Sequence, residues 1–462
     1  MRTENDSMGA MEVPEEALYG ASTQRAVMNF PISGQSMPEG FIRGLGLVKS
    51  ACATANEELG RLDPERAGLI REAAEEVYEG KLNDHFPVDV FQTGSGTSSN
   101  MNVNEVIANR CSQLAGRPIA SKDPVHPNDH VNLGQSSNDI IPTVLHVSLA
   151  VVIHAELVSA LERLHAALKE KSREFESVVK IGRTHLMDAT PLTLGQEFSG
   201  YAAQIDKGVA RARRAVETLH ELAIGGTAVG TGINCHPEFP GIVCRILEAR
   251  TEIPFREAQN HFEAQGGRDD AVEVAGILIT IAASLGKIAN DIRLLGSGPR
   301  SGIGEIQLPE TQPGSSIMPG KVNPVMSEML AQVSLWVHGL CNTVAAAGRD
   351  GHFELNVTIP LIAHCLHQSI ACLANGSRVF ADRCVSGISA NRERCAEQVE
   401  RSLMLVTALN PHIGYDNAAR VAKRAFQEGK TLREVVLEEE LLDEAALDAA
   451  LDPMKMIRPE PG

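Results

Sequence analysis

Apolar side chains recur at spacings of three and four residues through the middle of the chain. Between residue 140 and about residue 390 they form four stripes, which begin near residues 157, 198, 278 and 326. This period is typical of amphipathic helices, and no alternation with a period of two competes with it. No proline lies within 255–298, so one helix there could run for about 25 residues, or close to 40 Å. Helices of that length usually pack lengthwise, which predicts an all-α, mainly helical fold built on a bundle.

The segment 144–153 is apolar almost all round, because only His146 and Ser148 are polar in it. A helix without a polar face has to be buried on every side. A single chain of 462 residues has difficulty burying so many apolar faces, so we expect helices to pack between subunits. No uninterrupted apolar run reaches the ~18 residues of a membrane span, since Glu273 breaks the best candidate, 271–285.

The chain is strongly acidic, with 42 basic and 59 acidic residues and a formal net charge of −17. A surface of that charge repels phosphate backbones and anionic lipid, which argues against nucleic acid or a membrane as partners. Aromatic residues make up only 4 %, so few rings are present to stack on single-stranded nucleic acid. A small anionic substrate remains compatible with this charge if its site is locally positive.

The nine cysteines are scattered and contain no C-x-x-C pair. Unpaired cysteines fit a reducing compartment, and their spacing offers no zinc or iron–sulfur site, so we expect buried, inert thiols. The N-terminal residues carry acids and no apolar signal segment. Together these features predict a cytoplasmic location.

Five polar segments rich in glycine and proline interrupt the helical pattern, at 93–104, 126–142, 182–196, 225–234 and 312–328. Small hydroxyl, amide and glycine residues concentrate where backbone approaches a ligand. Segment 93–104 fits either a capped turn before a helix or an anion site at that helix's N-terminus. Segment 225–234 looks like a phosphate loop but lacks the Lys-Ser/Thr ending, so a tight turn is favoured over a nucleotide site.

Segments 126–142 and 182–196 also allow two interpretations each. Ser136, Ser137 and Asn138 can cap a helix that Pro142 helps to start. The histidines and the aspartate within 126–130 permit a metal site, although no further ligands follow at helical spacing. His185 lies among threonines in a break between long helices, where it could be structural or an acid–base group.

Segment 312–328 cannot be helical through most of its length, because prolines stand at 313, 319 and 324. It leaves a dense polar set of serines, Lys321 and Asn323, and Lys321 brings positive charge to an acidic chain. Glu328 falls in the first turn of the following helix, where an acid also suits the helix dipole.

These segments resemble the fumarase/aspartase superfamily. The stretch GSSIMPGKVNP at 314–324 is similar to its signature loop. Resemblance to the class II fumarases within it rests on TGSGTSSNMNVNE at 93–105, HPNDHVN at 126–132, QSSND at 135–139 and GRTHLMDATPLTLGQE at 182–197. It is extended by GGTAVGTGIN at 225–234, KIAND at 287–291, FELNV at 353–357 and SLMLVTALNPHIGYD at 402–416, so it covers essentially the whole chain.

The resemblance implies a protomer of three domains: a mixed, mostly helical domain at 1–133, a long central helical bundle at 134–392 and a small helical domain at 393–462. It implies a homotetramer with a 20-helix core and active sites built from three subunits. The implied activity is the reversible hydration of fumarate to L-malate, a step of the tricarboxylic acid cycle, with no metal and no organic cofactor.

By the family pattern Ser315 is the catalytic base, with its alkoxide stabilised by Lys321 and backbone N–H groups. His185 would handle the water or hydroxyl at C2, and Glu328 would hydrogen-bond to that histidine. The substrate shell carried over by the resemblance comprises Ser95, Gly96, Thr97, Ser136, Ser137, Asn138, Thr184, Ser316, Lys321, Val322 and Asn323.

A peripheral dicarboxylate site would comprise His126, Pro127, Asn128 and Asp129. The chain departs from the family pattern near this site, because Asp123 and Pro124 stand where a basic residue is expected. Leu133 and Gly134 also replace a more usual polar pair, for which we expect a small local effect.

Two alternatives use the same fold. An aspartase or another lyase of the superfamily would share the loop and the intermediate, but aspartase-like chains usually read PAKVNP where this chain has Gly320. A non-catalytic structural protein, of the kind that serves in the eye lens, could lose its acid–base residues, whereas His185, Ser315, Lys321 and Glu328 are all present here.

Overall fold

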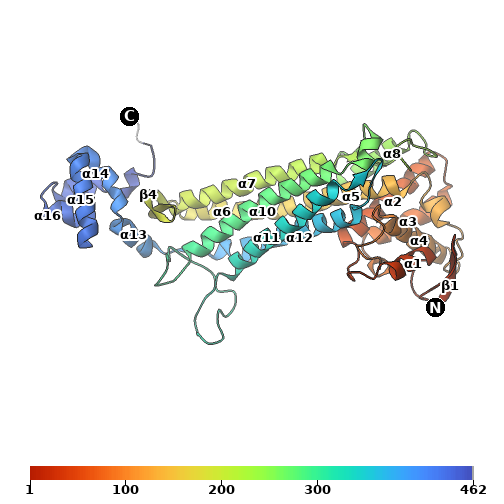
Figure 1. Ribbon diagram of the computed structural model, residues 1–462, viewed down its shortest axis with the longest axis horizontal. Coiled ribbons are helices and arrows are strands. Elements are labelled where there is room, and N and C mark those ends of the chain that lie inside the picture. The colour runs from red at the N-terminus through yellow and green to blue at the C-terminus, as the bar shows by residue number, and fades with distance from the viewer. Residues whose placement is uncertain (460–462) are drawn as a thin grey trace. The chain divides into compact units, whose positions relative to one another are not determined.

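The computed structural model describes residues 1–459, which divide between two compact units. Unit 1 consists of Met1–Ser159, Val209–Ala282 and Val333–Ala374. Unit 2 consists of Ala160–Gly208, Ala283–Gln332 and the described part of Asn375–Gly462. Figure 1 shows the elements of both units by label and colour.

Helices dominate both units. The α-helices are α1 (Ala21–Asn29), α2 (Glu39–Glu58), α3 (Pro64–Tyr78), α4 (Thr97–Leu114), α5 (Ser137–Val152), α6 (Ser159–Glu174), α7 (Leu194–Thr218), α8 (Phe239–Thr251), α9 (His261–Gly266), α10 (Asp269–Leu295), α11 (Val325–Gly348), α12 (Ile359–Arg383), α13 (Arg392–Arg401), α14 (Val406–Ile413), α15 (Tyr415–Glu428), α16 (Leu432–Glu438) and α17 (Glu444–Ala450). Short π-helical turns span Pro127–Val131 and Ile153–Val158, and 3₁₀ turns span Asn83–His85, Val385–Gly387, Leu403–Leu405 and Pro453–Lys455.

The strands are short and pair only in twos. They are β1 (Arg2–Asp6) with β2 (Gly9–Val13), β3 (Val179–Thr184) with β4 (Met187–Thr193), β5 (Glu221–Leu222) with β6 (Arg256–Glu257), β7 (Ile306–Gln307) with β10 (Ser389–Ala390), and β8 (Gly351–His352) with β9 (Leu355–Asn356). The pair β5–β6 is parallel and the others are antiparallel.

The apolar stripes form the buried faces of the long helices, as predicted. Leu161, Leu164 and Leu168 are completely buried in α6, and Leu278, Leu285 and Ile292 are completely buried in α10. Helix α10 runs for 27 residues, close to the length expected from the absence of proline. Within the all-apolar segment 144–153, residues 144–150 and Ile153 are buried as predicted, whereas Val151 and Val152 are partly exposed.

Unit 1 gathers the N-terminal helices around α2, which packs against α3 and α5, while α4 packs against α1 and α3 (Figure 1). The buried carboxylate of Glu105 in α4 fixes the start of α1, because it accepts the backbone N–H groups of Gly20, Ser22 and Thr23 at 2.9–3.1 Å. The buried surface of α4 therefore includes polar groups as well as apolar ones.

In unit 2 the sequence analysis missed the hairpin of β3 and β4. The alternation is hard to recognise because the strands are short and the register shifts between Ile181 and Arg183. Ile181 joins the apolar cluster of the C-terminal helices, which includes the completely buried Leu409, Val421 and Val435. Figure 1 shows helices α13 to α16 of that cluster in blue.

Two helical stretches are long and apolar enough to cross a membrane by length and composition alone, Ser137–Glu174 and Asp269–Leu295. In their most apolar windows 67 % and 44 % of the residues are buried inside the protein. Core helices of a bundle pass the same test. The lone Glu273 ends the uninterrupted apolar run but leaves the mean hydropathy of the α10 window at 1.8.

Candidate active site

The N-terminus of α4 is partly capped. The helix begins at Thr97 after Gly96, whose φ of 75° is the left-handed conformation that favours glycine. Gly96 has no side chain to cap the helix, but Gln92 Oε1 accepts the backbone N–H of Ser99 at 3.0 Å and its hydroxyl at 2.9 Å. Ser95 Oγ and Thr97 Oγ1 share a hydrogen bond of 2.8 Å beside this end. Segment 93–104 is therefore a turn with one side-chain cap, and the other N–H groups of this positively polarised helix end remain compatible with the anion site.

The N-terminus of α5 has a complete capping box. Ser136 Oγ accepts the N–H of Asn138 at 3.2 Å, and the carboxylate of Asp139 accepts the N–H of Ser136 at 2.8 Å. Capping by Ser136 confirms one of the three predicted candidates. Pro142 lies inside the helix rather than in its first turn, so it does not start it.

A hydrogen bond joins these two helix ends. Asn100 Nδ2 on the first turn of α4 donates to Ser137 Oγ at 3.0 Å. Thr97, Asn100 and Ser137 thus lie in one polar region of unit 1 where two positive helix ends meet. This region can bind a carboxylate through hydroxyl groups and helix N–H groups.

Asp139 also fixes segment 225–234. Its second carboxylate oxygen accepts the N–H groups of Gly225 at 3.1 Å and Thr227 at 2.9 Å, and Asn138 Nδ2 donates to Ala228 O at 2.8 Å. Burial raises the pKa of Asp139 to about 6, although the three backbone N–H groups oppose that rise. Segment 225–234 is a tight turn, as favoured from its sequence, and it holds the α5 end in place.

His185 lies at the tip of the β3–β4 hairpin in unit 2. It and Leu186 have positive φ angles of 56° and 61°, which is the conformation of a two-residue hairpin turn. Thr184, the last residue of β3, and His185 are both exposed. The hairpin therefore presents the imidazole outward from a rigid two-stranded support.

The 314–324 segment is irregular, as its prolines predict. Ser315 Oγ accepts the backbone N–H groups of Ile317 at 3.2 Å and Met318 at 3.1 Å. Asn323 Nδ2 closes the loop by donating to Gly314 O at 2.6 Å. A Cβ at Gly314 would lie 2.0 Å from the Lys321 carbonyl oxygen, so only glycine permits this close approach.

The remaining residues predicted on this segment are open to solvent. Ser316, Lys321 and Val322 are exposed, with the Val322 side chain 38 % accessible. Glu328 is exposed in the first turn of α11, as expected. Within residues 1–459 no hydrogen bond or ion pair joins His185 to Glu328 in one chain.

The predicted peripheral residues form a π-helical turn. His126 caps it, because its Nδ1 accepts the N–H groups of Asn128 and Asp129 at 3.3 and 3.2 Å. The adjoining cavity of about 340 Å³ is also lined by Glu4, Asp6 and Glu105. Lys122 also lines this cavity, and Glu4 and Asp6 are paired with Arg2 and Arg25. The peripheral site stays a prediction.

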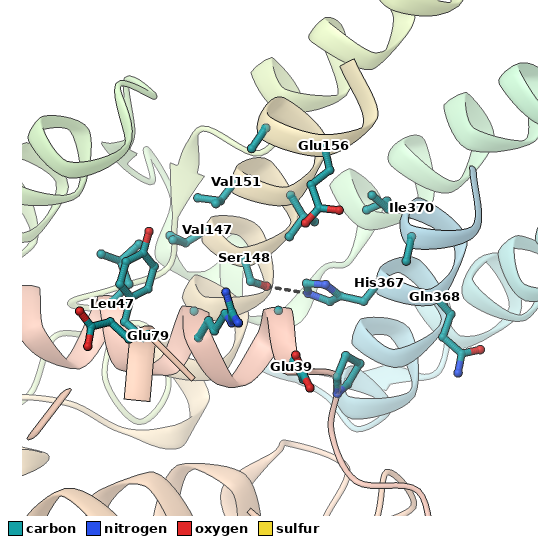
Figure 2. A pocket seen from close by; sticks show the side chains of 18 residues that line it. Glu39, Leu47, Glu79, Val147, Ser148, Val151, Glu156, His367, Gln368 and Ile370 are labelled. Carbon is teal, nitrogen blue, oxygen red and sulfur yellow. Dashed lines mark hydrogen bonds between the residues drawn. The ribbon is translucent and has the colours of Figure 1, made fainter. Parts of the chain in front are cut away.

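A separate cavity of about 570 Å³ lies in unit 1, between α2, α5 and α12, and none of the predicted site residues line it. Figure 2 shows Val147, Val151 and Ile370 on its walls and the 2.9 Å hydrogen bond between Ser148 Oγ and His367 Nε2. It is a mainly apolar space without a convergent set of reactive groups, and we assign it no ligand.

No group of three or more His, Cys, Asp or Glu side chains is arranged to hold a metal ion within residues 1–459. All nine cysteines are free, and seven of them are buried while Cys235 and Cys372 are partly so. Burial raises the pKa of Cys111 to about 12, which keeps this thiol protonated and unreactive.

Comparisons with known proteins agree with this picture. Residues 9–339 match the family described as lyase, and residues 405–458 match the family described as fumarase C C-terminus. The chain is 53 % identical over 458 residues to fumarate hydratase class II 2 of Bradyrhizobium diazoefficiens, covering 99 % of this chain and 97 % of that protein. It is 52 % identical over 458 residues to fumarate hydratase class II of Neisseria meningitidis, covering 99 % of both.

Solved structures give the same result. The fold matches the crystal structure of recombinant class II fumarase from Schistosoma mansoni with a TM-score of 0.95 and 42 % identity, covering both chains completely. The likeness extends over the long helices, the hairpin and the C-terminal helices alike, and it confirms the mainly helical fold.

Proposed function

Because the chain belongs to the lyase family, among the class II fumarate hydratases, we propose that it hydrates fumarate reversibly to L-malate, a reaction of the tricarboxylic acid cycle. The observation that carries this proposal is identity of 52–53 % over essentially the whole chain to relatives named for that activity. The polar segments carry groups of the kinds that this reaction needs.

Removal of the C3 proton of malate creates a doubly charged aci-carboxylate, which needs a base and electrostatic stabilisation. Ser315 is the base in this proposal. Two backbone N–H groups already point at its Oγ, and they would stabilise an alkoxide more strongly than a neutral hydroxyl. Lys321 adds a positive charge from the same loop.

His185 handles the oxygen at C2, protonating the hydroxyl that leaves malate and deprotonating the water that adds to fumarate. Its exposed position at a hairpin tip lets it reach into a site completed by other elements. Glu328 hydrogen-bonds to it in the assembled enzyme and orients the imidazole.

The two substrate carboxylates are held by hydroxyl, amide and N–H groups. The helix ends at Thr97 and Ser137 receive one carboxylate, with Ser95 and Asn138 beside them. Thr184, Ser316 and Asn323 belong to the segments that receive the other. So many donors with so little apolar lining suit a small dianion.

The sites are shared between subunits of a homotetramer in this proposal. No hydrogen bond or ion pair joins His185 to Glu328 within residues 1–459 of one chain, which agrees with their being supplied by different subunits. The long helices expose apolar side chains such as Leu335 and Trp336 on α11, which are 74 % and 55 % accessible. A 20-helix core would cover them.

The domain organisation and the cellular location are also part of the proposal. The boundaries 1–133, 134–392 and 393–462 stay predictions of the domain organisation. Relatives from Arabidopsis thaliana and Mus musculus are named as mitochondrial proteins. Nine free cysteines support a reducing compartment for this chain, which we take to be the cytoplasm.

One assay tests the function. The purified protein receives L-malate or L-aspartate, and the ultraviolet absorbance of the fumarate double bond is followed. We expect absorbance to rise with L-malate and not with L-aspartate. A rise with L-aspartate alone would assign the chain to the ammonia lyases, and no rise with either would remove the proposed activity.

A further inference from the structure

A lysine that the roles above do not use lies beneath the dicarboxylate site of unit 1. Lys49, in the middle of α2, is completely buried. Its Nζ donates to Asn132 Oδ1 at 3.0 Å and to Gln135 Oε1 at 2.8 Å. Both acceptors are neutral amides, and no carboxylate in residues 1–459 forms an ion pair with this ammonium group.

Burying an ammonium group without a paired acid is costly, so such groups are rare unless something else requires them. Burial lowers the pKa of Lys49 to about 7. Two other titratable groups face it: Cys52, whose pKa burial raises, and Asp139. The Asp139 carboxylate is occupied by three backbone N–H groups, so it compensates the lysine only from a distance.

The Lys49 contacts lead directly to the substrate-binding residues. Asn132 Oδ1 also accepts Asn100 Nδ2 at 3.2 Å, and the same Asn100 group donates to Ser137 Oγ. Asn132 Nδ2 donates to Gln135 O at 3.1 Å, immediately before Ser136. Lys49 therefore holds the turn 132–135, from which the α5 N-terminus begins.

We propose that Lys49 is a positioning residue for the dicarboxylate site: its ammonium group fixes the turn 132–135 against α4 and supplies the positive charge that selects a dianion. The proposal rests on the proposed function, since it assumes that the helix ends at Thr97 and Ser137 receive a substrate carboxylate. Lys49 does not touch substrate; it acts through Asn132 and Gln135.

A positioning role for the charged form of Lys49 predicts a dependence of substrate binding on pH that packing alone would not produce. A bound dianion favours the charged form of Lys49, so substrate binding and protonation of Lys49 strengthen each other by the same factor. Affinity for a dicarboxylate therefore falls as the pH rises above about 7, and binding at pH 8 takes up a proton.

The test compares Lys49→Met with Lys171→Met in the full-length enzyme. Lys171 is a buried lysine of unit 2, paired with Glu174 and with Ile388 O, and is outside the proposed site. We expect Lys49→Met to raise KM for fumarate by at least about tenfold with a smaller change in kcat, and to abolish the rise of KM with pH. Lys171→Met should leave KM and its pH dependence unchanged, and Lys49→Arg should restore part of the affinity.

Proton uptake supplies a second measurement that needs no turnover. Succinate, which lacks the double bond, is titrated into wild-type enzyme and into Lys49→Met at pH 8 in buffers of different ionisation enthalpy. Because His185 belongs to the same proposed site, only the uptake that is lost in Lys49→Met is assigned to Lys49. Loss of a substantial fraction of a proton per site supports the proposal, and uptake near zero in the wild type, or equal uptake in the two proteins, overturns it. An unchanged KM and pH profile in Lys49→Met would also overturn it. A wild-type enzyme that binds succinate with proton uptake but does not hydrate fumarate would instead contradict the proposed function.

Discussion

Arg183 and Glu305 form an ion pair with 2.9 Å between Nη1 and Oε1, and Glu305 is completely buried. Lys180 Nζ lies 3.2 Å from the other Glu305 oxygen and is itself buried. The atoms are within ion-pair distance but lack hydrogen-bond alignment, so charge rather than directional bonding holds them. Both cations belong to β3, which leads to His185, and Arg183 Nη2 also donates to Gln398 on α13 at 2.6 Å.

Glu305→Gln should therefore destabilise unit 2 and loosen the hairpin. Lys180 keeps Glu197 at 2.8 Å in this variant, whereas Arg183 loses its acidic partner. Removing one partner of a buried ion pair leaves uncompensated charge, and with Lys180 still paired we expect a cost of about 3 kcal/mol, the lower end of the usual range. Urea unfolding at one protein concentration measures the loss. Glu397→Gln, which removes an exposed partner of Arg394, is the control and should leave the midpoint unchanged. A wild-type midpoint in Glu305→Gln would show that the buried acid does not anchor the strand.

His185→Asn should reduce kcat by roughly 10²–10⁴-fold, the usual scale for a general acid–base group. The side chain is exposed at a turn, so the variant should fold and assemble normally. Circular dichroism and size-exclusion chromatography check the fold, and steady-state hydration of fumarate measures the activity. His412→Asn, an exposed histidine on α14, is the matched control. Near-normal turnover in His185→Asn would remove this residue from the mechanism.

Sequence reasoning found the elements whose signal is local. The stripe that includes Leu278 and Leu285 predicts a buried helix face, and the prolines at 313, 319 and 324 predict an irregular loop. It missed the β3–β4 hairpin, because the short strands and the register shift hide their alternation. Contacts between distant segments, such as Asn100 with Ser137, cannot be read from spacing.

The sequence does contain a sign that Lys49 is buried. It stands four residues after Leu45 and three before Cys52, on a helix face that is otherwise buried. A charged residue at such a position has to find partners inside the protein. The identity of those partners, Asn132 and Gln135, depends on the tertiary fold and is available only from the structure.

Shared active sites predict recovery of activity from two inactive variants. His185→Asn and Ser315→Ala should each be nearly inactive. If different subunits supply His185 and Ser315, a site in a mixed tetramer can combine an intact histidine with an intact serine. Random 1:1 assembly gives about a quarter of sites with both groups intact. The two variants are dissociated, mixed and reassembled, and each variant reassembled alone is the control. Activity that never exceeds these controls would indicate that one subunit supplies both groups.

Two buried histidines in unit 1 should make the protein sensitive to acid. His367 shares a 2.9 Å hydrogen bond with Ser148 Oγ, and burial lowers its pKa to about 3; burial also lowers the pKa of His146 to about 4. The unfolded chain binds protons at both residues below about pH 6.5, whereas the folded chain does not. The free energy of unfolding is therefore lost as the pH falls, by about 1.5–2 kcal/mol for His367 alone between pH 6.5 and 5.

His367→Gln should reduce this dependence, even if it lowers stability at pH 7. Urea unfolding at pH 5, 6 and 7, at one protein concentration, gives the slope for the wild type and the variant. His352→Gln, at an exposed histidine of β8, should keep the wild-type slope. A slope in His367→Gln equal to that of the wild type would mean that His367 gains a proton in the folded protein as readily as in the unfolded chain, and that its burial next to Ser148 does not limit the stability of unit 1 in acid.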